Sequence, residues 1–268
     1  MSARRSMLFT LKNGAASSYA ADFIAYYSIT NPTTQSALVT LENTLTLGGL
    51  INYASPSSNR ITNLYPMCGG TNVTQNLGNF LINSSLLTAY GGLTYNANGI
   101  TGNGVNGYVD TNQNAAALSV SDFHFGFYDK TVSSGTYSDF GFGNINAAPF
   151  AAYITNNFGT ALDDIPDSGF RVSYATPGTT NRFFCDSFYI DGLSPYPTTP
   201  KKFTYNNAVL YGSSIEPPFG TGNLVFLTGR TFYSPNTMNF AHYGRSLTPA
   251  QVTTVYNAIV AFNTTLGR

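Results

Sequence analysis

The end of the chain carries the feature that most restricts its fold, because one well-marked helix follows a long region of short alternating segments and turns. Thr248 suits the N-cap, Pro249 suits the first helical position because its missing N–H would lack a helical partner there, and Gln251 completes a capping box. Apolar residues then recur at three- and four-residue intervals: Val252, Val255, Tyr256, Ile259, Phe262 and Leu266. This stripe predicts a helix over 248–266 that is buried against the preceding strands.

The region before this helix is divided by frequent turn signals. Asn-Gly stands at 98–99, Asp-Ser-Gly at 167–169 and Asp-Gly at 191–192, with others between residues 69 and 245. Apolar and polar residues alternate between the turns, as at Phe123, Phe125 and Phe127. Such a pattern predicts many short antiparallel strands, each with one apolar face. A sheet with one apolar face needs a second sheet against it, so we predict a mainly β fold, an antiparallel two-sheet sandwich.

The first sixty residues contain helix start and stop signals in place of the alternating pattern, and they predict an α-hairpin. One helix follows Ser18, and a second begins at Asn31-Pro32 and ends at Gly48-Gly49. We therefore divide the chain into an N-terminal helical arm, 1–58, and a β-sandwich, 59–268, closed by the C-terminal helix. Two roles for the arm stay open: packing over one end of the β domain, or docking onto a neighbouring subunit.

Composition narrows the class of partner. Only 9% of residues are charged and the net charge is zero, so the chain lacks the basic surface that nucleic acid requires. No run approaches the roughly 18 apolar residues of a membrane helix, and residues 12–14 interrupt the apolar run after Arg4-Arg5 too early for an export signal. We expect a soluble protein with no nucleic-acid partner and no membrane insertion. Cys68 and Cys185 are predicted to be buried reduced thiols, with a disulfide as the alternative.

Catalytic residues are hard to find in this sequence. Glycoside hydrolysis needs two carboxylates on either side of the scissile bond, yet Glu42 and Glu216 are the only glutamates. His124 and His242 stand in alternating aromatic segments, where a half-buried strand residue is expected rather than a base or metal ligand. We therefore predict no catalytic residue, no cofactor and no enzyme activity.

Carboxylates cluster most densely at Asp163, Asp164 and Asp167, in the segment ALDDIPDSG. Clustered oxygen donors could bind Ca²⁺, and a solvated turn is the other interpretation. Asp110, with Thr111 and Asn112, and Asp139 are further oxygen donors at expected strand ends. The solvated turn is the favoured interpretation, so the metal prediction is none, with the first cluster as the candidate.

Tyrosines beside amide and carboxylate groups suggest sugar recognition. An aromatic ring covers the C–H side of a pyranose, while amides and carboxylates bind its hydroxyls. The candidate ligand-binding residues are Tyr128, Tyr137, Asp139, Tyr153 and Asn156. The same residue types also suit a protein–protein interface, in which charged groups are depleted.

Three stretches of the chain together resemble a group of tailed-phage virion proteins that contain a concanavalin A-like, laminin-G-type jelly-roll domain. They are ADFIAYYSITNPTTQSALVTLENTL with NLYPMCGGT, then YGGLTYNANGITGNGVNGYVDT with SDFHFGFY, and finally FAHYGRSLTPAQVTTVYNAIVAFNTTLGR. The resemblance implies a jelly-roll sandwich and a structural protein of the virus particle, located in a capsid decoration, head fibre, tail or baseplate. It implies other virion proteins as partners, a homo-oligomer, and contact with host-surface polysaccharide. It transfers no catalytic site.

Three functional hypotheses follow. The first is a non-enzymatic structural subunit of a phage particle that contacts host glycans. The second is a carbohydrate-binding adhesin module whose assembly role is secondary. The third, a glycoside hydrolase or lyase on a jelly-roll scaffold, is disfavoured by the shortage of glutamate.

Overall fold

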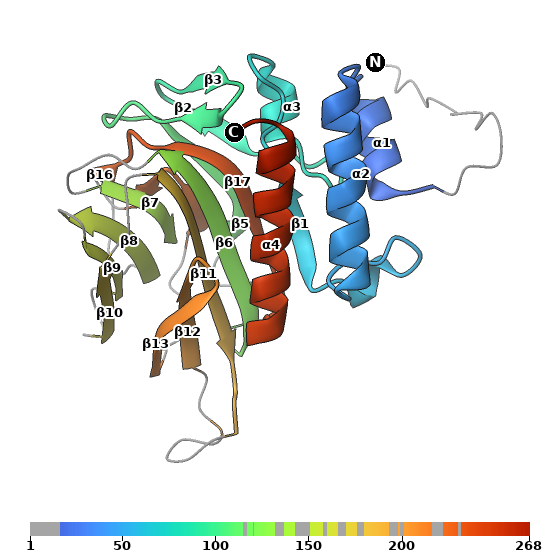
Figure 1. Cartoon of the computed structure of the whole chain (residues 1–268). Coiled ribbons are helices and arrows are strands. Elements are labelled where there is room, and N and C mark those ends of the chain that lie inside the picture. The colour runs from blue at the N-terminus through green and yellow to red at the C-terminus, as the bar shows by residue number, and fades with distance from the viewer. Residues whose placement is uncertain are drawn as a thin grey trace, which may run out of the picture.

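The protein is built in three layers: two β-sheets face each other, and three helices lie on the outer side of one of them (Figure 1). The computed structural model describes residues 17–114, 117–119, 121–131, 137–142, 151–157, 160–165, 170–175, 180–192, 198, 201–215, 222–229 and 232–268. Within these residues every named strand pairing is antiparallel. The predicted two-sheet sandwich, with helices at both ends of the chain, is confirmed.

The larger sheet, which carries the helices, contains eight of the described strands in the order β13-β12-β11-β6-β17-β4-β3. The eighth strand, β1, pairs with the C-terminal half of β17, on the same side of β17 whose N-terminal residues pair with β4. The bounds are β1 (Ile61–Tyr65), β3 (Thr94–Asn96), β4 (Gly99–Thr101), β6 (Asp122–Thr131), β11 (Thr180–Tyr189), β12 (Lys201–Asn206), β13 (Val209–Ile215) and β17 (Thr237–Gly244).

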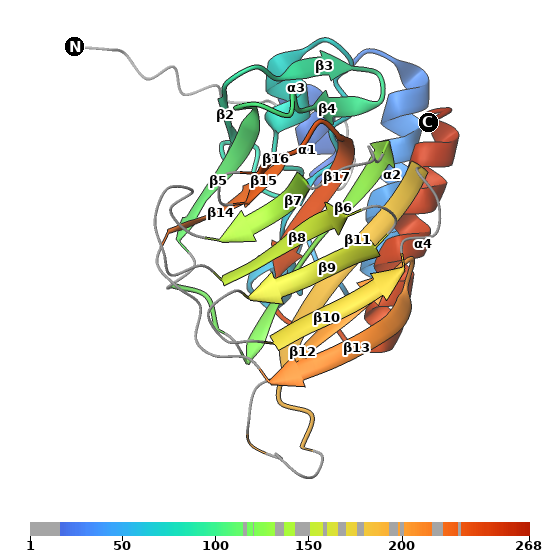
Figure 2. The same ribbon diagram turned by 90° about the vertical axis from the view of Figure 1, so that its left-hand side faces the viewer.

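The smaller sheet contains seven of the described strands, in the order β10-β9-β8-β7-β14-β5-β2. Figure 2 shows this sheet from its outer side, where none of the described helices lies over it. The bounds are β2 (Thr88–Tyr90), β5 (Tyr108–Asn114), β7 (Tyr137–Phe142), β8 (Ala151–Asn157), β9 (Thr160–Ile165), β10 (Phe170–Ala175) and β14 (Asn223–Phe226). A short hairpin, β15 (Thr228–Gly229) with β16 (Phe232–Tyr233), adjoins it.

Side-chain caps define where the helices begin. Helix α1 (Tyr19–Tyr26) starts after the N-cap Ser18, and α2 (Pro32–Leu47) starts after the N-cap Asn31. The predicted capping box at Thr248 and Gln251 is present at the start of α4 (Pro249–Thr265). Two short elements, the 3₁₀ helix η1 (Pro56–Ser58) and α3 (Val73–Leu77), complete the helical structure of the described residues. No described helix is long and apolar enough to cross a membrane.

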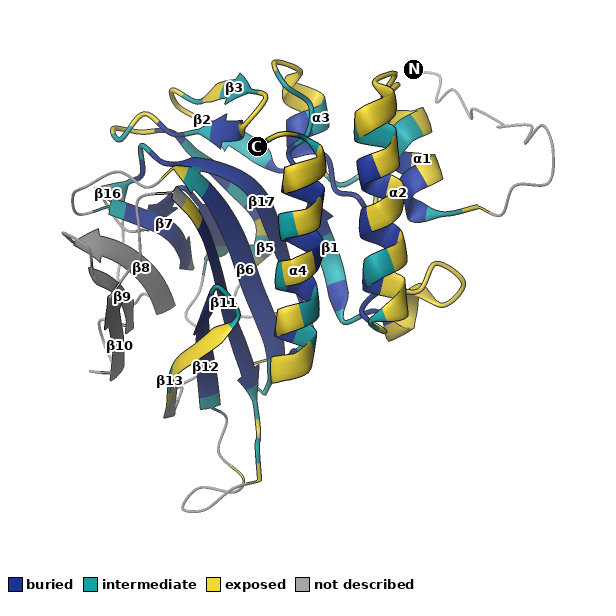
Figure 3. Ribbon diagram, viewed as in Figure 1, coloured by how far each residue is buried: buried dark blue, intermediate teal, exposed yellow. Residues whose placement is uncertain are grey.

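Two apolar clusters lie in the two spaces between the three layers. The inner cluster fills the sandwich, and its rings pack closely: Phe125 and Phe140, from opposite sheets, stack with centroids 3.6 Å apart. The outer cluster joins α1, α2 and α4 to the outer face of the larger sheet, and the predicted apolar stripe of α4 packs into it (Figure 3). The helices of the N-terminal arm therefore share one hydrophobic core with the β domain. Cys68 and Cys185 are both free thiols, and Cys185 is fully buried.

Candidate functional site

The outer face of the smaller sheet presents aromatic and polar side chains side by side at its β2–β5 end. Strand β2 pairs with β5 so that Tyr90 lies opposite Tyr108 and Thr88 opposite Asp110. Between them, Val109 belongs to the inner core and Ala89 packs against it. Because side chains alternate along a strand, the flanking residues of both strands project outward, away from the sandwich core. This is the side that no described helix covers.

Three tyrosine rings form a row on this face. Tyr90 and Tyr108 stack with centroids 4.7 Å apart and an interplanar angle of 11°, and Tyr233 of β16 lies 6.3 Å from Tyr108. Partial burial, followed by the neighbouring Tyr90 and Asp110, raises the pKa of Tyr108. Tyr90 is 43% exposed and belongs to the edge strand, so one side of its ring packs on Tyr108 and the ring remains accessible to solvent.

Polar groups beside this row are held by hydrogen bonds. Asp110 Oδ1 accepts from the backbone N–H of Asn112 at 2.6 Å, and Asp110 Oδ2 accepts from Asn223 Nδ2 at 3.0 Å. Asn112, whose φ of 59° lies in the left-handed region, donates from Nδ2 to Thr88 Oγ1 at 2.9 Å. We name this surface the tyrosine–aspartate face, and its members are Thr88, Tyr90, Tyr108, Asp110, Asn112, Asn223 and Tyr233.

The chemistry of this face is recognition rather than bond cleavage. An accessible tyrosine ring can stack on the apolar side of a sugar ring, and a carboxylate with spare lone pairs can accept from its hydroxyls. Each oxygen of Asp110 accepts one of the bonds above, which leaves acceptor capacity on both. The seven members include a single carboxylate, whereas glycoside hydrolysis uses two.

Two of the predicted ligand-binding residues are buried instead of exposed. Tyr128 lies on β6 within the outer cluster, 6% exposed, and burial together with Tyr256 of α4 raises its pKa to about 12. Asp139 is fully buried between the sheets. The prediction that these two side chains reach a surface ligand is therefore wrong.

Asp139 belongs to an ion cluster that crosses the sandwich. Arg182 of β11 pairs through Nη2 with Asp129 of β6 at 2.6 Å and with Asp139 of β7. Ser234 and Asn236 also donate to Asp139 Oδ1. Burial and the neighbouring Asp139 raise the pKa of Asp129 well above its usual value, although Arg182 acts in the opposite direction. This cluster ties the two sheets together where the aromatic core ends.

The remaining sequence candidates fall on the strands of the smaller sheet. Tyr137 is half-buried on β7, and its backbone lies opposite that of Asn156 on β8. Tyr153 is also on β8, and the side chains of Tyr153 and Asn156 lie outside the described residues. The structure therefore does not gather the five predicted residues into one site.

Two of the three carboxylates proposed for Ca²⁺ lie in a strand. Asp163 and Asp164 are part of β9, whose backbone pairs with β8 on one side and β10 on the other. Asp167, like the side chains of the other two, lies outside the described residues. Within the described part of the chain, no group of three or more His, Cys, Asp or Glu residues is arranged to hold a metal ion.

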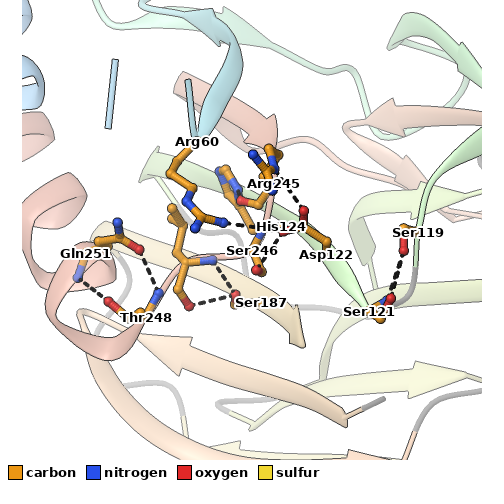
Figure 4. Close-up of polar contacts among 11 residues, drawn as sticks. Arg60, Ser119, Ser121, Asp122, His124, Ser187, Arg245, Ser246, Thr248 and Gln251 are labelled. Carbon is orange, nitrogen blue, oxygen red and sulfur yellow. Dashed lines mark hydrogen bonds and ion pairs between the residues drawn. The ribbon is translucent and has the colours of Figure 1, made fainter. Parts of the chain in front are cut away.

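A polar junction joins β6 and β17 to the start of α4 (Figure 4). Asp122 accepts from Arg245 Nε at 2.8 Å and from the backbone and hydroxyl of Ser246, and Arg60 lies 3.5 Å away. A small cavity of about 220 Å³ lies beside it, lined by Arg60, Tyr189, Gln251 and residues 246–249. Ser187 of β11 adds two hydrogen bonds, in which its hydroxyl donates to the carbonyl of Leu247 and accepts from the N–H of Leu247. These contacts fix the connection into the helix.

The sequence contains a signal for the tyrosine–aspartate face, although none of the five predicted ligand-binding residues belongs to it. Thr88 and Tyr90 alternate with Ala89 just before Gly91-Gly92, and Tyr108 and Asp110 alternate with Val109 just after Gly107. The sequence shows Asp110 and Asn112 as oxygen donors at an expected strand end, but it does not show the register that brings β2 beside β5. The pairing of these strands is what assembles the face.

No protein-family model and no curated protein matches this sequence. Solved structures are similar to it at the level of fold. The binding domain of botulinum neurotoxin serotype D is 10% identical with a TM-score of 0.53, over 74% of this chain and 51% of that chain. Trypanosoma rangeli sialidase, in complex with 2,3-difluoro-KDN, is 11% identical with a TM-score of 0.56, over 83% of this chain and 38% of that one. The binding domain of botulinum neurotoxin DC, in complex with SialylT, is 10% identical with a TM-score of 0.51, over 74% and 50%.

The chain thus spans about half, or less, of the length of these structures. At such low identity the similarity shows the fold alone, a concanavalin A-like jelly roll. The concanavalin A-like part of the sequence resemblance is confirmed, and its virion part stays a prediction.

Proposed function

We propose that the chain is a non-catalytic structural component of a phage particle whose jelly roll binds carbohydrate on a host surface through the tyrosine–aspartate face. The observation that carries the binding proposal is the stacked, accessible Tyr90–Tyr108 pair beside the fixed carboxylate of Asp110. The assignment to a phage particle rests on the sequence resemblance.

Carbohydrate is the ligand class that best suits this combination of groups. A pyranose has an apolar C–H side and a rim of hydroxyls. A protein that binds it therefore places an aromatic ring and fixed hydrogen-bond acceptors close together. Tyr108 and Asp110 are two residues apart on one strand, a spacing of about 7 Å. Among the similar structures, one is a complex with SialylT, one is a complex with 2,3-difluorosialic acid, and one is of a toxin whose cell entry depends on two ganglioside molecules; these ligands support carbohydrate as the ligand class here.

A non-catalytic role is supported by the position of the one glutamate in the described residues. Glu42 of α2 accepts from the backbone N–H groups of Tyr19 and Ala20, both at 2.9 Å, and is buried. Its carboxylate satisfies the first turn of α1 and fixes the angle between the two helices. Glu216 lies outside the described residues.

A structural role within a particle is supported by the outer surface of the neighbouring helices α2 and α4. Their exposed positions carry no charged side chain in the described structure: Pro32, Thr33, Ser36, Val39, Thr40, Asn43, Thr46 and Leu47 on α2, and Pro249, Ala250, Thr253, Asn257, Ala261, Thr264 and Thr265 on α4. Burying charged groups between subunits costs desolvation energy, which such a surface avoids. Other virion proteins and further copies of this chain are the partners we propose for this surface.

A binding experiment with matched variants tests the carbohydrate proposal. The full chain is applied to an array of bacterial surface polysaccharides and oligosaccharides, and hits are measured by calorimetry. Tyr90→Ala and Tyr108→Ala are expected to weaken binding at least tenfold, because burying a large apolar side chain contributes about 1.5–3 kcal/mol and each 1.4 kcal/mol is a factor of about ten in affinity. Tyr26→Ala, at an exposed ring on α1 that is 56% accessible, is the control and should bind normally. Binding that all three variants retain would place the ligand elsewhere.

A further inference from the structure

The seven residues of the tyrosine–aspartate face carry one negative charge and no positive charge. Asp110 is the single carboxylate among its seven members, and none of these described residues is a Lys, Arg or His. Both oxygens of Asp110 are held by neutral donors, the N–H of Asn112 and the amide of Asn223. Neutral donors orient the carboxylate without cancelling its charge.

A carboxylate held in this way can only accept hydrogen bonds. Two neighbouring hydroxyls of a sugar can each donate one hydrogen bond to the carboxylate, and both bonds are strengthened by its negative charge. A carboxylate on the ligand has no hydrogen to donate and adds a second negative charge at close range. Two like charges about 4–6 Å apart near a protein surface repel enough to change affinity several-fold.

The stacked tyrosines strengthen this selection. The ring faces carry partial negative charge, so they attract C–H groups and cations and offer nothing to an anion. Tyr108 lies next to Asp110, whose charge helps to raise the pKa of that phenol. The phenol therefore stays protonated and neutral at physiological pH.

Resting on the proposed function, we infer that the face selects uncharged hexopyranoses with adjacent free hydroxyls and discriminates against sialic and uronic acids. This selectivity would distinguish the chain from the similar structures that are complexes with SialylT and 2,3-difluorosialic acid. The host structure recognised is accordingly a neutral polysaccharide or the neutral segment of a mixed one.

The test uses glycan pairs that differ only in one carboxylate: neutral oligosaccharides and the same oligosaccharides carrying a sialic or uronic acid. Neutral members should bind at least about fivefold more tightly, a ratio that corresponds to Coulomb repulsion at this range. Asp110→Asn should reduce that ratio to about one, because it keeps the shape of the side chain and removes its charge.

Asp122→Asn is the matched control. It changes the net charge of the molecule equally, but Asp122 lies at the α4 junction and not in the face. The preference for neutral glycans should survive in this variant. Tighter binding of the acidic members, with Tyr90→Ala still harmful, would overturn this inference and leave the proposed function standing. Failure of every glycan to bind would overturn both.

Discussion

The buried pair of histidines makes the stability of this fold depend on pH. His124 of β6 and His242 of β17 are fully buried under α4, with His124 Nε2 3.0 Å from His242 Nδ1. His124 Nδ1 lies 2.5 Å from the carbonyl oxygen of Arg245, which can only accept, so Nδ1 carries the hydrogen. His124 Nε2 must then accept from the Nδ1–H of His242. The chain of bonds ends at His242 Nε2, which has no hydrogen-bond partner in the described structure.

Protonation of this pair would place charge in a fully buried environment. Burial lowers the pKa of His124 from 6.5 to about 4, against smaller opposing effects of the Arg245 carbonyl and Asp122; Arg60 lowers it further. Burial and the neighbouring His124 lower the pKa of His242 well below its usual value. Because the folded-state pKa is depressed, the unfolded chain binds protons first as the pH falls below 6.5, and the folded state loses stability.

The size of the effect for His124 follows from these two values. Between pH 7.5 and pH 5, a shift from 6.5 to about 4 destabilises the folded state by about 2 kcal/mol. His242 adds to this loss. Asp129 opposes it, because its raised pKa makes the folded state the better proton binder. A comparison that cancels Asp129 is therefore needed.

The experiment measures urea unfolding of the natural chain and of His124→Gln at both pH values. The stability difference between the two proteins should shrink by about 2 kcal/mol on going from pH 7.5 to pH 5, because only the natural chain has the His124 titration and Asp129 is common to both. The chain contains 2 histidines, so NMR of the imidazole protons gives an independent readout. Either imidazole titrating near pH 6.5 in the folded protein would refute the reasoning.

Two further predictions concern the ion cluster and the helix cap. Arg182→Met should lower the free energy of unfolding by roughly 3–5 kcal/mol in urea denaturation, because it leaves Asp129 and Asp139 buried without their cation. Asp129→Asn should cost less than about 1 kcal/mol, because that carboxyl has a raised pKa and an amide resembles its protonated form; equal losses in both variants would contradict this account. Thr248→Ala should cost about 1 kcal/mol by removing the N-cap of α4, and Thr253→Ala, at an exposed position of the same helix, is the control in the same assay.

The local parts of the fold were predictable because each depends on neighbours in sequence. Thr248, Pro249 and Gln251 define a helix start without reference to the rest of the chain, and the same holds for Ser18 and Asn31. Alternating phenylalanines required strands with one buried face, and the turns between them required antiparallel pairing. Two facing sheets follow from these facts alone.

The candidate site was less predictable because it depends on which face of each sheet is covered. Alternation places Tyr128 and Phe127 on opposite faces of β6, but it does not show that α4 covers the face of Tyr128. Asp139 reads as a strand-end carboxylate until Arg182 is known to lie across the sandwich from it. Tyr90 and Tyr108 stand far enough apart in sequence that only the pairing of β2 with β5 makes them neighbours.

The distribution of cover over the two sheets explains where recognition can occur in this molecule. All three long helices lie on the larger sheet, so its outer face is apolar and carries buried rings, cysteine and the histidine pair. The described residues between the sheets form a tightly packed aromatic cluster with the buried Arg182 ion cluster beside it. The smaller sheet has no such helical cover in the described structure, and polar residues there can remain hydrated without a partner. Exposed aromatic surface often marks a binding site, and Tyr90 exposes its ring near the carboxylate of Asp110. Because the larger sheet is covered by helices and this face is not, we place binding at the β2–β5 end of the smaller sheet.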